Sequence, residues 1–113
     1  MKLLSAEICI LSILLSSAAF AGSVIDLDDK AGKSLQITTI FINDASTSIS
    51  KRPFIEVKFG DGTPYCNVFP DLAKRNNMSL AELARGLRNK GSFLYCKTTP
   101  QGNFEGESIL LEY

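Results

Sequence analysis

Alternating apolar and polar positions predict the strands of this chain. In residues 53–59, Ile55, Val57 and Phe59 fall on one side, while Phe54, Glu56 and Lys58 fall on the other. A period of two is typical of a strand that buries one face. Apolar, β-branched runs bounded by Gly, Pro or Asn predict further strands. The expected strands are residues 34–42, 53–59, 63–69, 92–98 and 104–113, with a short additional strand considered at residues 24–27.

One helix is expected between the third and fourth of the five main strands. The run Ser79-Leu80-Ala81-Glu82 matches the capping box, in which each polar side chain accepts a hydrogen bond from the other residue's backbone N–H. The apolar positions follow the spacing i, i+3, i+4, i+7 of a single helix face; they are Leu80, Leu83, Ala84 and Leu87. Gly91 suits the end of the helix, and residues 71–77 before it are expected to be a polar connection.

The first 21 residues have the features of a secretion signal. Lys2 precedes an apolar run at residues 8–15, and Ala19-Phe20-Ala21 fits the small-residue rule for cleavage after Ala21. A membrane anchor is the alternative, but the run is shorter than the roughly 20 apolar residues that a span needs. The expected organisation is a signal peptide (1–21), an N-terminal arm (22–33) and one folded domain (34–113). We therefore expect an exported protein, periplasmic or secreted, without stable membrane insertion.

The cysteines indicate one disulfide. Cys9 falls within the predicted signal, so Cys66 and Cys96 remain in the exported chain. An even pair in an exported chain is read as a bridge. The two are too far apart for a C-x-x-C redox motif, and two thiols without His make a poor metal site.

The order of elements indicates the fold class. Three strands, one helix and two strands follow one another, which is the chain order of the OB-fold, a small Greek-key barrel. A mixed sheet with a helix across one face would give the same order. The expected fold is mainly β with one helix, an OB-like five-stranded barrel (β-β-β-α-β-β) with one disulfide.

Four stretches of the chain carry a family resemblance. They are FIEVKFGDG, MSLAELARGLRNKG, SFLYCKT and ESILLEY, with a polar Gly/Asn turn before the last. In this order they resemble the B subunits of bacterial pentameric toxins of the Shiga, subtilase-cytotoxin and pertussis types, and related small secreted bacterial proteins of unknown function. The resemblance covers residues 53–113. It implies an OB-fold, a host glycan or receptor as ligand, a homo-pentamer, and a toxin A-type subunit as partner. It assigns no sugar-binding residue, and the chain lacks the Trp that often stacks on sugars in that family.

Composition and charge exclude several functions. The chain has 12 basic and 12 acidic side chains, whereas nucleic-acid binders normally carry a basic excess. The absence of His excludes Ser-His and Cys-His catalytic pairs and histidine-bearing metal sites. Neighbouring carboxylates such as Glu105 and Glu107 are typical of a solvated strand face. We therefore expect no catalytic residue, no metal, no cofactor and no nucleic-acid partner.

Two functions of different classes remain. The first is a non-catalytic module that binds a glycan or receptor, as OB barrels do with their loops and strand faces. Its expected ligand contacts lie in two polar segments, the loop 43–50 and the turn 101–104; they are Asn43, Asp44, Thr47, Ser48, Gln101, Asn103 and Phe104.

The second function is a periplasmic or secreted protein-interaction domain, an inhibitor or assembly partner without a sugar site. It needs only an exposed apolar patch or a free strand edge. In a toxin-like ring, Phe54 and Phe93 are the expected subunit contacts.

Overall fold

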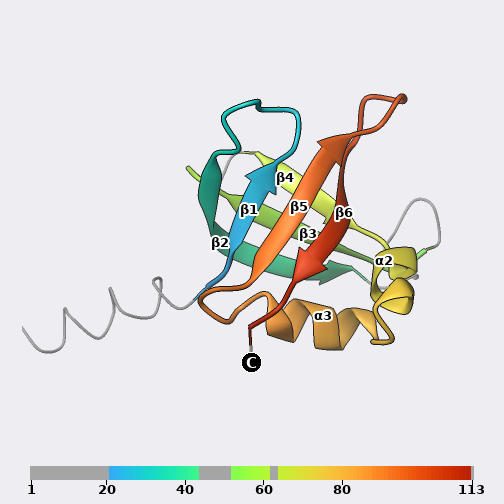
Figure 1. Cartoon of the computed structure of the whole chain (residues 1–113). Helices are drawn as coiled ribbons and strands as arrows, with labels where there is room; N and C mark the ends of the chain where they lie inside the picture. Colours follow the sequence, from blue (N-terminus) through green and yellow to red (C-terminus); the bar gives the residue numbers. More distant parts are fainter. Residues whose placement is uncertain (1–20, 44–51, 62–63, 113) are drawn as a thin grey trace, which may run out of the picture.

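The computed structural model describes residues 21–43, 52–61 and 64–112. Within these ranges the chain forms six strands and two short helices (Figure 1). The strands are β1 (Ser23–Asp26), β2 (Ser34–Asn43), β3 (Phe54–Phe59), β4 (Tyr65–Val68), β5 (Phe93–Thr98) and β6 (Phe104–Leu110). The helices are α2 (Pro70–Arg75) and α3 (Leu80–Gly86). The expected mainly β class is confirmed. The described residues form one strand more than the five expected and one helix more than the single helix expected.

The six strands close into a barrel in the order β1-β2-β3-β4-β6-β5. Five of the six pairings that close it are short ladders, and the sixth is a single parallel bridge between Asn67 of β4 and Glu105 of β6. β1 runs antiparallel to β2 and parallel to β5. The sheet is therefore closed on itself, rather than open with a helix across one face.

β1 is the additional strand, and it lies in the segment expected to be an N-terminal arm. Val24 is 0% exposed, and the N–H groups of Ser23 and Leu27 donate to the carbonyls of Ser92 and Cys96 at 2.9 and 2.8 Å. Four residues carry little periodicity of their own. The strand is held by its two neighbours, because it lies between β2 and β5 and pairs with both.

The alternation predicted for β3 is confirmed by burial. Ile55 and Val57 are 0% exposed and Phe59 is 4% exposed, while the residues between them are only partly buried. These three side chains form the barrel core together with inward residues of the other strands and the buried faces of both helices.

The capping box predicted for α3 is present. Ser79 Oγ accepts from the N–H of Glu82, and Glu82 Oε1 accepts from the N–H of Ser79, both at 3.1 Å. The helix ends at Gly86, earlier than Gly91, and the chain continues in turns up to Gly91. Leu87 is still fully buried, so the predicted apolar stripe packs on the core through its last residue.

α2 occupies the segment expected to be a polar connection. Pro70 begins this helix, because its fixed φ suits the first helical turn. Leu72 and Ala73 are 3% and 2% exposed, and α2 contacts β6. The helix is too short to show a clear period, and its two buried residues are what hold it in place.

The predicted disulfide between Cys66 and Cys96 is confirmed. Both residues are 0% exposed, and their Cα atoms lie 6.5 Å apart. The bridge joins β4 to β5, the two strands that flank β6 in the barrel. The helices α2 and α3 lie within the loop of the chain that it closes.

We predict that removing this bridge strongly destabilises the barrel. The cysteines are 30 residues apart, and closing a loop of this size in the unfolded chain corresponds to about 3–4 kcal/mol. The double variant Cys66→Ala/Cys96→Ala should lose about that much unfolding free energy in urea denaturation. Reducing agent should destabilise the wild type similarly and leave the double variant unchanged; equal stability of the oxidised wild type and the double variant would contradict the prediction.

Candidate functional site

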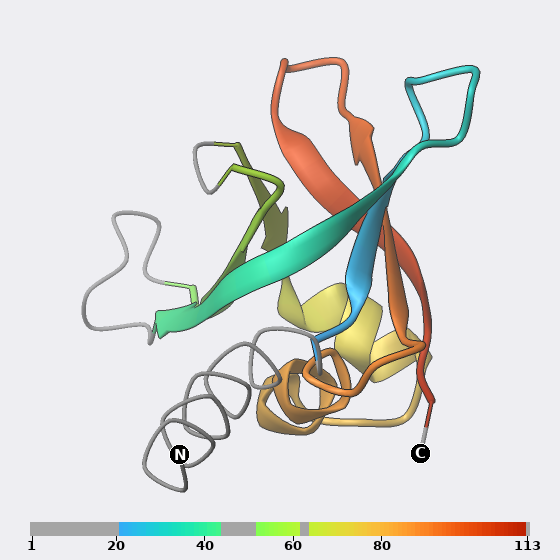
Figure 2. The same cartoon turned by 90° about the vertical axis from the view of Figure 1, so that its left-hand side faces the viewer.

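The two ends of the barrel differ. Both helices lie at one end, where β4 ends and β5 begins, while the loops β1–β2 and β5–β6 project from the opposite end (Figures 1 and 2). At this second end, called the mouth below, β1, β3 and β5 finish and β2, β4 and β6 start. The mouth is therefore where side chains from all six strands converge without a helix covering them.

A cavity of about 480 Å³ opens at the mouth. Its lining combines carboxylates with aromatic and aliphatic side chains, contributed by the strand ends and the adjoining loops. The lining residues are Asp26, Asp28, Leu35, Phe59, Pro64, Tyr65, Thr98 and Phe104.

Strand alternation explains why a carboxylate reaches this cavity. Val24 points into the core, so Asp26, two residues later, points to the same side of β1. Asp26 lies opposite Cys96 of β5, which is itself 0% exposed. Asp26 Oδ1 accepts from the N–H of Asp28 at 2.9 Å, which fixes the carboxylate at the start of the β1–β2 loop.

Asp28 is held against the end of β5. The hydroxyl and the N–H of Thr98 donate to Asp28 Oδ2 at 2.6 and 3.0 Å. These two hydrogen bonds, and to a smaller extent the charge of Lys97, lower the pKa of Asp28 despite a small opposing effect of desolvation. Asp28 is therefore a carboxylate at neutral pH, and it ties the start of the β1–β2 loop to the end of the neighbouring strand β5.

Aromatic rings form the other part of the lining. The rings of Phe59 and Phe104 lie 5.9 Å apart, centroid to centroid, at an angle of 41°. Phe59 belongs to the core, whereas Phe104 is partly buried and Tyr65 is 49% exposed. The cavity thus has an aromatic floor formed by Phe59 and Phe104 and an accessible tyrosine at its rim.

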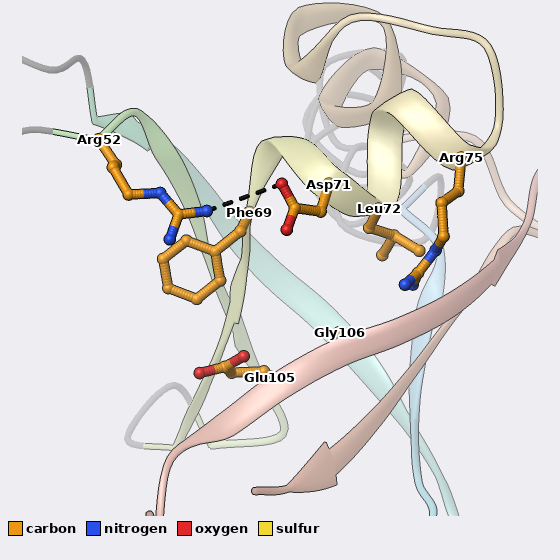
Figure 3. A pocket seen from close by; sticks show the side chains of 7 residues that line it. All are labelled: Arg52, Phe69, Asp71, Leu72, Arg75, Glu105 and Gly106. Atoms are coloured by element: carbon orange, nitrogen blue, oxygen red, sulfur yellow. Dashed lines mark ion pairs between the residues drawn. The ribbon is translucent and has the colours of Figure 1, made fainter.

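A second hollow, of about 260 Å³, lies between α2 and β6 (Figure 3). Arg52 pairs with Asp71 at 3.7 Å and lies over the ring of Phe69, 5.3 Å from its centroid. Across the hollow, a guanidinium N–H of Arg75 donates to the carbonyl of Glu107 at 2.9 Å. The two arginines that line this hollow face two carboxylates, those of Asp71 and Glu105, so its charges balance.

The structure separates the two predicted groups of ligand contacts. Phe104 lines the mouth cavity, and the exposed Gln101 and Asn103 belong to the turn that leads into it. Asn43 pairs with Phe54 at the opposite end of β3, away from the mouth. The other three predicted contacts, Asp44, Thr47 and Ser48, lie outside the described residues, as does the predicted signal peptide apart from Ala21.

The two predicted subunit contacts are both partly buried on the outer face of the barrel. The rings of Phe54 and Phe69 lie with their centroids 5.9 Å apart and are tilted by 34°. Phe93 lies 6.5 Å from the ring of Tyr95 and opposite Leu110, which is 57% exposed. The side chains of Phe93, Tyr95 and Leu110 form an outer apolar strip over β5 and β6.

Sequence reasoning missed Asp26, Asp28 and Tyr65 as lining residues. Asp26 and Asp28 fall in the segment 22–33, which was expected to be an N-terminal arm. A period of two from Val24 to Asp26 was the available signal, since it places a carboxylate on an interior face.

Within the described part of the chain, no group of three His, Cys, Asp or Glu side chains is placed to hold a metal ion. No helix in the same ranges is long and apolar enough to cross a membrane. Comparison with protein-family models, with curated proteins and with solved structures found no match.

We predict that Thr98→Val raises the pKa of Asp28 toward that of an ordinary aspartate, because it removes the hydroxyl that lowers this pKa most. Ionised Asp28 stabilises the fold above the unfolded pKa of about 3.9, and this contribution is lost as the pH falls through the lower folded value. The stabilities of wild type and variant should therefore converge in acid.

An NMR titration of the side-chain carboxyl carbons measures this pKa directly. Thr99→Val is a matched control, because Thr99 Oγ1 accepts from the N–H of Asn103, whereas the residue that donates to Asp28 is Thr98. An unchanged Asp28 pKa in Thr98→Val would contradict the assignment.

Proposed function

We propose that this chain is an exported, non-catalytic binding domain with an OB-like barrel, which holds its ligand at the mouth. The observation that carries the proposal is the mouth cavity, a concave site lined by aromatic rings and a few fixed polar groups. Such a combination is the usual form of a small-ligand site.

The strand order supports the OB-like relationship. Without β1, the order is β2-β3-β4-β6-β5, with the helices between β4 and β5 as in an OB barrel. β1 then lies between the first and fourth strands of that barrel. OB-folds bind through the loop between their fourth and fifth strands among others, and the corresponding β5–β6 turn here borders the cavity through Thr98 and Phe104.

The buried disulfide supports export, because such bridges persist in oxidising compartments. Carbohydrate is the ligand class that an exported OB-like module of zero net charge suits best, since oligonucleotides need a basic surface. A toxin B-subunit-like role, with several weak sites in a homo-pentamer that gain strength through multivalency, is the corresponding biological proposal.

We predict that Tyr65→Ala weakens saccharide binding about fivefold to tenfold, because it removes the accessible ring at the rim. Binding is measured by NMR shift perturbation during titration with a panel of mono- and disaccharides. Tyr95→Ala is the matched control, since Tyr95 lies on the outer strip and does not line the cavity. Shifts that cluster away from the mouth, or equal losses in both variants, would count against this site.

A protein-interaction domain is the second candidate, and the outer apolar strip of Phe93, Tyr95 and Leu110 favours it. Copies of this chain carry no net charge, so long-range repulsion does not oppose their association through the strip.

We predict that Phe93→Asp dissociates an oligomer without unfolding the domain, because Phe93 is only partly buried within one chain. Light scattering after gel filtration gives the mass of both proteins, and circular dichroism checks the fold. Leu27→Asp is a control at another exposed apolar residue, 44% exposed in the β1–β2 loop. A monomeric, folded wild type would exclude the ring.

A further inference from the structure

We infer that the mouth cavity selects ligands that carry a protonated amine or a quaternary ammonium group. The inference rests on the proposed binding function and names the chemistry of its ligand. The shared feature is an organic cation, which an amino sugar or a choline-like group could supply. A neutral or acidic sugar lacks it.

The charge of the lining is the first argument. Asp26 and Asp28 both line the cavity, and no Lys or Arg of the described ranges does. Asp28 stays ionised because Thr98 donates two hydrogen bonds to it. One oxygen of each carboxylate accepts hydrogen bonds, Oδ1 of Asp26 and Oδ2 of Asp28. The site therefore presents two negative charges to whatever enters it.

The nearby cations lie outside the cavity. Lys97 is close enough to lower the pKa of Asp28, but it is exposed and adjacent to Cys96, whose side chain points into the core. Lys58 lies on the outer face, with Nζ 5.5 Å from the ring centroid of Phe41. Lys30 and Lys33 are exposed on the β1–β2 loop and do not line the cavity. These side chains reduce the negative potential at the mouth but do not occupy the site.

The aromatic lining is the second argument. A cation within about 6 Å of a ring centroid is attracted to the ring face, and the attraction is larger where water is excluded. Tyr65 is an accessible ring at the rim, and Phe104 and Phe59 form the floor. Aromatic faces combined with carboxylates suit an alkylammonium group better than they suit a neutral hydroxyl group.

The second hollow provides an internal contrast. Its two arginines and two carboxylates balance, and Arg52 already occupies the face of the Phe69 ring. An incoming ammonium group would meet as much repulsion as attraction there. Charge selection is therefore expected at the mouth and not between α2 and β6.

Two matched pairs of probes test the inference on the oxidised protein. Choline is compared with its uncharged analogue, in which carbon replaces nitrogen, and glucosamine is compared with glucose. The titrations are run by NMR at about pH 6, where an amine with a pKa near 7.7 is protonated. We expect at least one cationic member to bind at the mouth about tenfold more tightly than its neutral partner, with an affinity that falls as salt is added.

Asp26→Asn tests the role of charge, because the amide oxygen keeps the acceptor for the Asp28 N–H while the charge is lost. We expect about tenfold weaker binding of the preferred cation. Asp71→Asn is the control, since it removes one charge from the second hollow. The backbone NMR spectrum confirms that both variants are folded, and Tyr65→Leu separately removes the ring face at the rim.

The outcomes distinguish this inference from the proposed function. The inference is supported if the protein prefers the cationic probes and if this preference is lost in Asp26→Asn but kept in Asp71→Asn. The probe pair that shows the preference then identifies the source of the cation. Equal binding of charged and neutral probes at the mouth overturns the inference and leaves the binding function standing. If none of the four probes and no member of the saccharide panel binds at the mouth, both the inference and the proposed binding function are overturned.

Discussion

The closure of the barrel by β1 is the constraint on which the rest of the structure depends. β1 lies between β2 and β5 and pairs with the backbone groups of both strands. This pairing buries Val24 completely and thereby places Asp26 on the interior side at the mouth. The mouth cavity is thus a consequence of how the sheet closes. The four residues of β1 complete the barrel and also supply Asp26, one of the two carboxylates that line the cavity.

The features predicted from sequence are those that short stretches of chain determine by themselves. β3 has a full alternation over six residues, α3 has its own capping box, and the disulfide follows from a pair of cysteines in a chain that is expected to be exported. β1 was considered at residues 24–27 but was left out of the five main strands, and α2 was missed, because four and six residues carry too little periodicity. Each is held mainly by partners elsewhere in the fold.

The site itself was predictable only in part, for a related reason. Phe104 was identified because it lies in a polar turn, yet Asn43, which has a similar local context, lies at the other end of β3. Which strand ends share a mouth depends on the order of strands in the barrel, and no local pattern encodes that order. The contrast between a mouth with two carboxylates and a hollow with balanced charges depends on the same long-range arrangement.

The contact between Asp28 and Thr98 also has a consequence for the order of folding. The two residues are 70 positions apart, and pairing of β1 with β5 spans a similar distance. Bringing such distant segments together costs more chain entropy than forming the local β3–β4 hairpin, so closure is expected late in folding. A chain that has formed its hairpins but not this contact has no mouth, so the mouth cavity is complete only when the whole barrel has closed.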